Sequence, residues 1–245
     1  MTTVADFIEE HGRVPKLGDS TPPWRFRGWF LHYVQEIQRL IPDVADRWGY
    51  LAETVEAGRY LDAPIPRIKF CGEGDRILAE GDKNIQATIN CFAQGSWEGL
   101  HRFVEWLGFA LGVSKDYPAG VPDSDAEKAY QTFDAGLWLL HPHDYLGRHI
   151  AMTRGNRGWN PNAFYPTPHC VVDTMVKMQF ADETRDLRGL SVCDPCVGTG
   201  RMLLHASNYS MNLHGMDIDP LMVAITKING AVYAPWLVCP PRFRC

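Results

Sequence analysis

The sequence predicts a mixed α/β protein, in which a mostly helical region is followed by a small parallel sheet. Two observations lead to this prediction. Over residues 1–150, apolar residues recur at the spacing of helices. Over residues 151–245, short strand candidates alternate with helical segments, which is typical of parallel strands joined by crossover helices. We therefore expect two regions, 1–150 and 151–245, with the boundary near residue 150.

Two helical stripes carry the prediction for the first region. Residues 97–112 and 29–41 each place their apolar side chains on one face of a helix. The Pro- and Gly-rich stretch 115–124 indicates a surface loop, and Asp144 is expected near the N-cap of a further helix. The stripe residues are Leu100, Phe103, Val104, Leu107 and Leu111 in the first segment, and Phe30, Val34, Ile37 and Ile41 in the second.

The second region is organised differently. Its elements are short, and strand and helix patterns follow one another along the chain. In chain order we expect a loop and helix at 165–180, a strand at 187–194, a helix at 200–210, a strand at 212–219 and a helix at 220–234.

Composition and charge limit the classes of protein to consider. The chain of 245 residues is 45% hydrophobic and 22% charged, and its net charge of −5 is concentrated in residues 1–150. It has no apolar run of about 18 residues and no signal-peptide profile, so we expect no membrane partner and a cytoplasmic location. The one basic stretch, 152–160, is too short to predict tight unaided DNA binding.

The stretch "DPCVGTG" at 194–200 indicates a ligand site. A strand ending in Asp194 runs into Gly198 and Gly200, and glycines there let backbone amides approach a ligand closely. The spacing is neither that of a dinucleotide pyrophosphate site nor that of a phosphate-binding P-loop. Asp217, at the tip of the second strand, is placed to accept hydrogen bonds from ribose hydroxyls. A nucleoside without phosphates, such as S-adenosylmethionine, fits this pattern.

Three segments in this order resemble a known family. They are "FYPTPHCVVDTMV" (164–176), "DPCVGTGRMLL" (194–204) and "GMDIDPLMVAITKIN" (215–229). They are similar to motifs of the class I S-adenosylmethionine-dependent DNA methyltransferases of the adenine-N6 kind. "DYLGRHIAM" (144–152) also resembles a short helix of modification subunits in restriction systems. The resemblance covers about residues 143–233 and implies a partial Rossmann-like core.

The resemblance also implies a cofactor site and residue roles within it. Thr167, with Tyr165 and Pro168, would border the methionine end of S-adenosylmethionine. Asp194 would face the ammonium group of the ligand. Asp217 would hold the ribose and Ile218 would pack on the adenine. The implied cofactor-binding residues are Tyr165, Thr167, Pro168, Asp194, Cys196, Gly198, Gly200, Asp217 and Ile218.

The catalytic loop of this family, [NDS]-P-P-[YFW], is not found in its expected place. That loop holds a flipped adenine between a polar acceptor, a proline carbonyl and an aromatic ring. The segment 239–243 offers Cys239, Pro240, Pro241 and Phe243, but with Cys for the polar residue and Arg242 inserted. It lies only 22 positions after Asp217, where 236–239 has room to be a third strand at most. Thr21–Trp24 is the other candidate, as in a circularly permuted enzyme.

Two functions from different classes follow from this. The first is a DNA adenine-N6 methyltransferase that uses S-adenosylmethionine and reaches DNA through a complex. The second is a non-catalytic regulatory or scaffold subunit, or one half of a split enzyme whose protein partner completes the sheet. A small-molecule or RNA methyltransferase is a third possibility. The C-x-x-C at 193–196 is only half of a zinc site, so we expect no metal.

Overall fold

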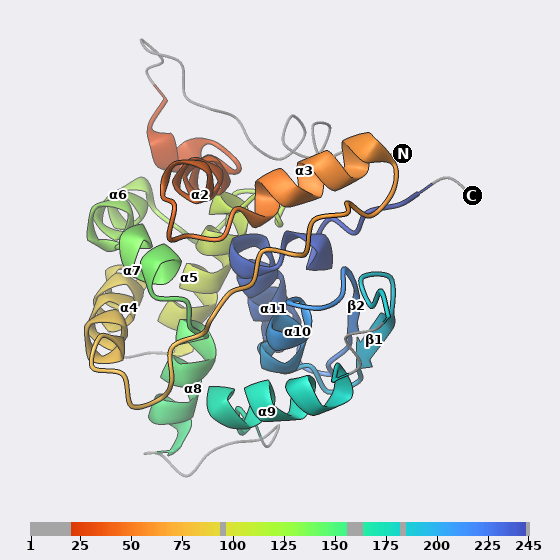
Figure 1. The fold of residues 1–245 in the computed structure, drawn as a ribbon. Coiled ribbons are helices and arrows are strands. Elements are labelled where there is room, and N and C mark those ends of the chain that lie inside the picture. Colours follow the sequence, from red (N-terminus) through yellow and green to blue (C-terminus); the bar gives the residue numbers. More distant parts are fainter. Residues whose placement is uncertain (1–20, 94–96, 156–163, 182–184, 244–245) are drawn as a thin grey trace.

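The structure, a computed structural model, describes residues 21–93, 97–155, 164–181 and 185–243. Helices dominate it, and a two-stranded parallel sheet lies at one side (Figure 1). The predicted mixed α/β character is therefore confirmed, whereas the partial Rossmann-like core is not confirmed, because the described residues form a sheet of two strands. The helical elements up to residue 155 are η1 (Pro23–Arg25), α2 (Trp29–Leu40), α3 (Arg47–Ala57), α4 (Leu78–Phe92), α5 (Trp97–Ala110), α6 (Asp123–Thr132), α7 (Ala135–Leu140) and α8 (Tyr145–Gly155).

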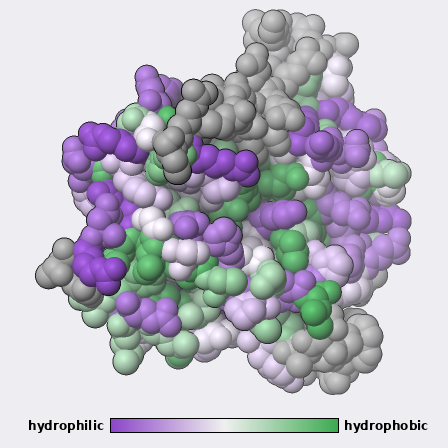
Figure 2. All heavy atoms as spheres, turned by 90° about the vertical axis from the view of Figure 1, so that its right-hand side faces the viewer, coloured by the Kyte–Doolittle hydropathy of each residue, from purple (hydrophilic) through white to green (hydrophobic). Residues whose placement is uncertain are grey.

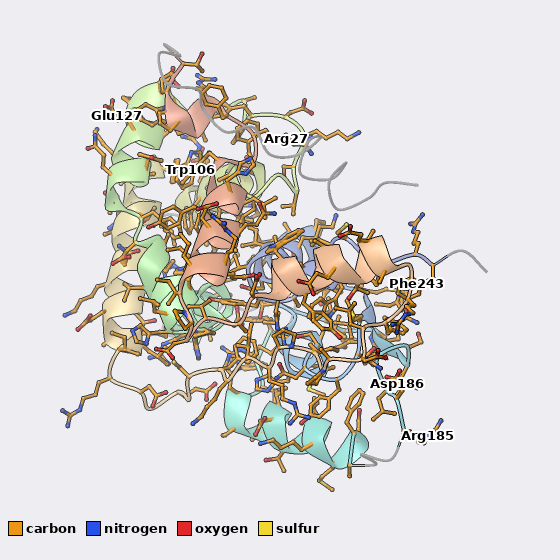
Figure 3. All side chains as sticks on the ribbon, turned by 45° about the horizontal axis from the view of Figure 1, so that its top comes forward. Arg27, Trp106, Glu127, Arg185, Asp186 and Phe243 are labelled. Atoms are coloured by element: carbon orange, nitrogen blue, oxygen red, sulfur yellow. The ribbon has the colours of Figure 1, made fainter. Side chains whose placement is uncertain are left out.

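The predicted helical stripes form the core of the first region. Phe30 and Val34 of α2 are buried, as are Phe103 and Leu107 of α5, while Ile37 is half-buried. Trp106 lies inside this bundle (Figure 3). The sequence analysis did not single out helix α4, although Leu78, Ile85, Ile89 and Phe92 form a buried apolar face on it together with Gly81 and Thr88.

The sheet follows in the order the sequence predicts. Helix α9 (His169–Gln179) precedes β1 (Ser191–Asp194), and α10 (Arg201–Ala206) crosses over to β2 (Asn212–Gly215), which leads into α11 (Pro220–Tyr233). The strands are parallel, with Ser191 opposite Asn212 and Asp194 opposite Gly215. The carboxyl ends of both strands therefore meet at one edge, where the glycine turn and Asp217 follow them.

One hydrophobic core joins the two regions. Arg47 of α3 is fully buried and donates to Ser207 Oγ at 2.6 Å and to the Tyr233 carbonyl at 2.7 Å. The Trp48 indole donates to the Ala231 carbonyl at 2.9 Å. The boundary predicted near residue 150 falls inside α8, and the buried core runs past it without interruption.

One face of the sheet is uncovered. Ser191, Cys193 and His214 are exposed, although parallel sheets are normally covered on both faces. Among the described residues, β1 and β2 pair only with each other. Figure 2 views the molecule from the side on which the sheet lies, and hydrophobic residues there are interspersed with hydrophilic ones.

The segment after α11 does not form the third strand that the sequence allowed at 236–239. Residues Pro235–Leu237 form a short 3-10 helix, η2, in which Trp236 is fully buried. Pro235 at its start and Pro240 after it disfavour a paired strand, because proline has no backbone N–H to donate. Within the described ranges, no helix has the length and apolar character needed to cross a bilayer.

Candidate functional site

The glycine turn after β1 is held in a left-handed conformation at two positions. Gly198 has φ +53° and Gly200 has φ +93°, a region that side-chain-bearing residues rarely adopt. A Cβ at Gly198 would lie 3.1 Å from the Phe164 ring, so the close approach of the two segments also favours glycine. Two backbone hydrogen bonds continue the pairing of β1 and β2 into the turn. The Met216 amide donates to the Asp194 carbonyl, and the Val197 amide donates to the Met216 carbonyl.

Asp217 closes the turn from the second strand. Its Oδ2 accepts a hydrogen bond from the Gly198 amide at 2.8 Å, and its Oδ1 accepts one from the Asp219 amide at 2.9 Å. Each carboxylate oxygen keeps a further lone pair. Asp194 is arranged similarly, since its Oδ1 accepts from the Cys196 amide at 3.1 Å.

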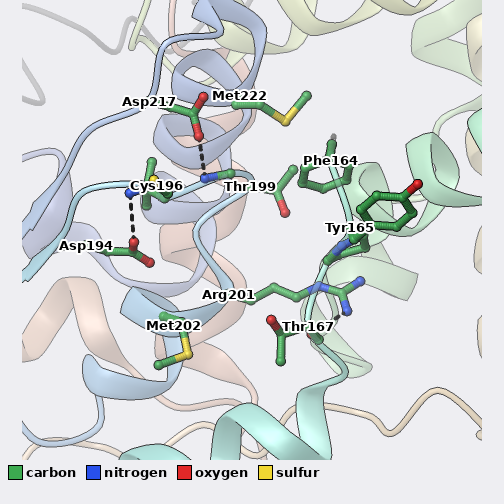
Figure 4. Close-up of a pocket in the computed structure, with 13 residues that line it drawn as sticks. Phe164, Tyr165, Thr167, Asp194, Cys196, Thr199, Arg201, Met202, Asp217 and Met222 are labelled. Atoms are coloured by element: carbon green, nitrogen blue, oxygen red, sulfur yellow. Dashed lines mark hydrogen bonds between the residues drawn. The ribbon is translucent and has the colours of Figure 1, made fainter. Parts of the chain in front are cut away.

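A cavity of about 190 Å³ lies between the glycine turn and the segment before α9 (Figure 4). One wall is formed by 164–167 and the other by 194–202, and Asp217 and Met222 complete the lining. The Tyr165 side chain at the rim is 81% exposed. The cavity is smaller than the roughly 300–1,000 Å³ of common small-molecule sites, so a larger ligand would extend beyond it.

Arg201 joins the two walls. Its Nη1 donates to the Thr167 carbonyl and to Glu73 Oε1, each at 3.0 Å, and its Nε donates to Asp144 Oδ2 at 2.8 Å. Burial alone would raise the pKa of the Asp144 carboxyl. The charge of Arg201 and the hydrogen bonds from Thr199, Arg201 and Gly147 outweigh burial and hold this pKa below its ordinary value. Asp144 is therefore a buried carboxylate, and it compensates the cation that lines the cavity.

The charges that remain in the cavity are negative. Arg201 is paired with Asp144 and Glu73 behind the wall, whereas Asp194 and Asp217 line the cavity. The electrostatics therefore favour a ligand that carries positive charge or hydroxyl donors, and disfavour phosphate groups.

The structure brings most of the predicted cofactor residues together. Six of the nine line the cavity, and the other three do not. Pro168 precedes α9, Gly200 caps α10 behind the lining, and the Ile218 side chain is 89% exposed beside the cavity. The six that line it are Tyr165, Thr167, Asp194, Cys196, Gly198 and Asp217.

Neither candidate catalytic loop reaches this cavity. Phe243, labelled in Figure 3, packs edge-on against Tyr60, with the ring centroids 4.7 Å apart. Tyr60 in turn lies against Gly189, ahead of β1. Gly189 precedes β1, and Asp194 ends it about 10 Å further along the strand, so Phe243 lies toward the opposite end of the sheet. None of Cys239, Pro240, Pro241 and Phe243 lines the cavity.

The segment Thr21–Trp24 also lies away from the cavity. Trp24 packs against Tyr130 of α6, with ring centroids 5.6 Å apart. Neighbouring Arg25 forms an ion pair with Asp123 at 2.5 Å. Like 239–243, this segment does not approach the residues that line the cavity.

Several site residues were not predicted from the sequence. Arg201 had a recognisable signal, because a cation at a helix N-terminus is electrostatically unfavourable and needs a buried acid nearby. Phe164 lay inside a segment that was recognised, but no role was assigned to it. Others that the cavity or its support adds are Pro166, Val197, Thr199, Met202 and Met222, with Asp144 and Asn229 behind them.

The cysteines near the site are free thiols. Cys170, Cys193 and Cys196 are exposed, and Cys196 lines the cavity. In the part of the chain that the structure describes, no three His, Cys, Asp or Glu side chains are placed to hold a metal ion.

Comparisons with protein-family models, with curated proteins and with solved structures returned no match to this chain. The functional interpretation therefore depends on the geometry of the cavity and on the three sequence segments that form it.

Proposed function

We propose that the cavity binds S-adenosylmethionine and that the chain takes part in methyl transfer to the N6 amine of adenine in DNA. One observation carries the proposal: the three segments that resemble family motifs are separate in the sequence, yet all contribute to one cavity. Segment 164–167 forms one wall, 194–200 forms the other, and Asp217 closes the end.

The polar groups of the cavity fit such a ligand. The ligand carries a sulfonium, an ammonium group and two ribose hydroxyls, and it has no phosphate. Asp194 Oδ2 has no hydrogen-bond partner among the described residues and is available to an ammonium group. Asp217 retains lone pairs for hydroxyl donors. The apolar surfaces of Phe164 and Met222 supply walls for a flat base.

The chemistry would be direct. Bound S-adenosylmethionine would supply an activated methyl group: the N–CH3 bond to the amine would form as the S–CH3 bond breaks, leaving a neutral thioether, and the amine would lose a proton to solvent. The residues of this chain would bind and orient the donor, which lowers the barrier chiefly by proximity and alignment. The exposed rim at Tyr165 marks the side from which an acceptor would approach.

A second candidate function is favoured by the uncovered sheet. The exposed face at Cys193 and His214, and strand edges to which no other described residue pairs, suit a protein partner that adds strands and supplies the catalytic loop. In this reading the chain binds the cofactor and acts as a scaffold or as half of a split methyltransferase.

Calorimetry with S-adenosylmethionine tests the cofactor assignment. We expect the purified chain to bind S-adenosylmethionine and not ATP, because phosphates would meet Asp194 and Asp217. Asp217→Ala should abolish binding. Asp219→Ala is the matched control, since Asp219 caps α11 outside the cavity. Unchanged affinity in Asp217→Ala would defeat the assignment.

Transfer of labelled methyl to unmethylated DNA separates the two functions. Label in adenine from the chain alone would support the complete enzyme. Cofactor binding without label would support the scaffold or split enzyme, and light scattering of the complex from host extract would then identify a stable partner.

A further inference from the structure

Asp144 is the centre of a buried hydrogen-bond network behind the cavity. Its side chain is 0% exposed and receives four donors. Oδ2 accepts from Thr199 Oγ1 at 2.5 Å and from Arg201 Nε at 2.8 Å. Oδ1 accepts from the Gly147 amide at 2.9 Å and from Asn229 Nδ2 at 3.0 Å. The carboxylate thus links α8, the glycine turn and α11.

Asn229 fixes the turn from the opposite side. Its Nδ2 also donates to the Thr199 carbonyl at 2.9 Å, so one amide group joins Asp144 to the backbone of the turn. Both neighbours are acceptors, which sets the orientation of the amide. Thr199 is therefore held through its hydroxyl by Asp144 and through its carbonyl by Asn229.

Gly147 is needed for this arrangement. A Cβ at this position would lie 2.0 Å from Asp144 Oδ2 and 2.6 Å from Thr199 Oγ1. No side chain fits between the α8 backbone and the turn. The Asp144 carboxylate, the Gly147 backbone and the Thr199 hydroxyl are therefore in direct mutual contact.

Through Arg201 the network reaches the other wall. Arg201 holds the Thr167 carbonyl and Glu73, and Glu73 Oε1 also accepts from the His169 amide at 2.9 Å. We propose that Asp144 is the positioning residue of the cavity, and that it fixes the spacing of the two walls through Thr199 and Arg201. This inference rests on the proposed function for the identity of the ligand, S-adenosylmethionine. The part that concerns how firmly the glycine turn is held does not depend on that ligand.

The test compares threonine variants. Thr199→Val removes the hydroxyl that Asp144 accepts and keeps the shape, whereas Thr199→Ser retains a hydroxyl. Thr88→Val is the matched control, because Thr88 is equally buried and donates to the Asn84 carbonyl at 2.8 Å, far from the cavity. Asp144→Asn removes the charge at nearly constant volume.

Two measurements are made on each variant. Hydrogen exchange of the turn amides at 197–201 is followed in the ligand-free protein, and the Kd for S-adenosylmethionine is measured by calorimetry. We expect Thr199→Val and Asp144→Asn to speed exchange of the turn and to raise Kd about tenfold or more, since a hydrogen bond to a buried charge is lost. Thr199→Ser should restore both values, and Thr88→Val should leave both unchanged.

The outcomes separate this inference from the proposed function. If wild-type protein binds and Thr199→Val binds equally well with an unchanged turn, Asp144 is not the positioning residue. If wild-type protein does not bind S-adenosylmethionine, the cofactor assignment fails, and hydrogen exchange of the turn amides alone tests the positioning role of Asp144. Faster exchange in Thr199→Val then supports the positioning role, and unchanged exchange overturns it.

Discussion

The Asp217 carboxylate accepts a hydrogen bond from the Gly198 amide at 2.8 Å, which joins the tip of the second strand to the turn after the first. At this bond the Gly198 backbone is left-handed, and the Phe164 ring leaves no room for a side chain on it. The carboxylate is thus oriented by backbone amides of the protein itself.

Gly198→Ala should weaken ligand binding beyond its effect on stability. A Cβ there adds strain at positive φ and contacts the Phe164 ring at the cavity. Gly58→Ala is the matched control, because Gly58 has φ +64° and open space around it. Both substitutions should cost about 1–2 kcal/mol of unfolding free energy. Only Gly198→Ala should raise the Kd for S-adenosylmethionine, and equal Kd values for the two variants would contradict this.

Ligand binding should protect Cys196 from alkylation. Its thiol is exposed and lines the cavity, whereas the exposed thiol of Cys170 does not line it. With saturating S-adenosylmethionine, iodoacetamide labelling of Cys196 should slow several-fold while labelling of Cys170 stays constant. Peptide mass spectrometry reports both rates from one sample. Equal protection of the two thiols would indicate a general change and not occupancy of the cavity.

The protein should lose stability as the pH falls from about 6.5 towards 4. Burial lowers the pKa of His205 from 6.5 to about 4, and the charge of Asp173 only partly opposes this. Between these values the unfolded state binds a proton that the folded state does not, so the free energy of unfolding decreases by up to about 1.4 kcal/mol per pH unit.

His205→Gln should reduce the pH dependence of the unfolding free energy by the equivalent of about one bound proton. Urea unfolding at several pH values measures this. His101→Gln is the control, because His101 is exposed on α5. His143 and His169 are also buried beside His205, and burial lowers the pKa of each, to about 2 for His169, so some pH dependence should remain. An unchanged slope in His205→Gln would contradict the prediction.

Separate fragments 1–150 and 151–245 should not fold. The cut passes through α8, and it separates Arg47 and Trp48 from their buried acceptors on α11 and near α10. Removing the acceptors of a buried guanidinium is strongly destabilising. We expect neither fragment to show a cooperative thermal transition by circular dichroism, under conditions in which the full chain does. A cooperative transition in either one would establish an independent domain.

Local pattern predicted the elements well. The stripes of α2 and α5, the N-cap at Asp144, the helix after Pro168 and the parallel order of β1 and β2 all follow from spacing over a few residues. The segments that line the cavity were also predicted, because the carboxyl ends of neighbouring parallel strands lie at the same edge of a sheet.

Contacts between residues far apart in the chain could not be predicted from the sequence. Arg201 and Asp144 are 57 positions apart, and nothing in either segment specifies their pairing. The close packing of Gly81 in α4 on the Tyr145 ring is likewise a contact that only the tertiary structure reveals. The assignments of cofactor, DNA and catalytic loop depend on resemblance and remain predictions.

The contrast between the inner and outer parts of the cavity bears on how such a site changes in evolution. Asp144, Thr199 and Asn229 are hydrogen-bonded to one another in the interior, so altering one leaves a buried polar group without its partner. Tyr165 and Ile218 are largely exposed and carry few such obligations. Single changes at Tyr165 or Ile218 should therefore cost the fold little, whereas the buried network changes only when several residues change together.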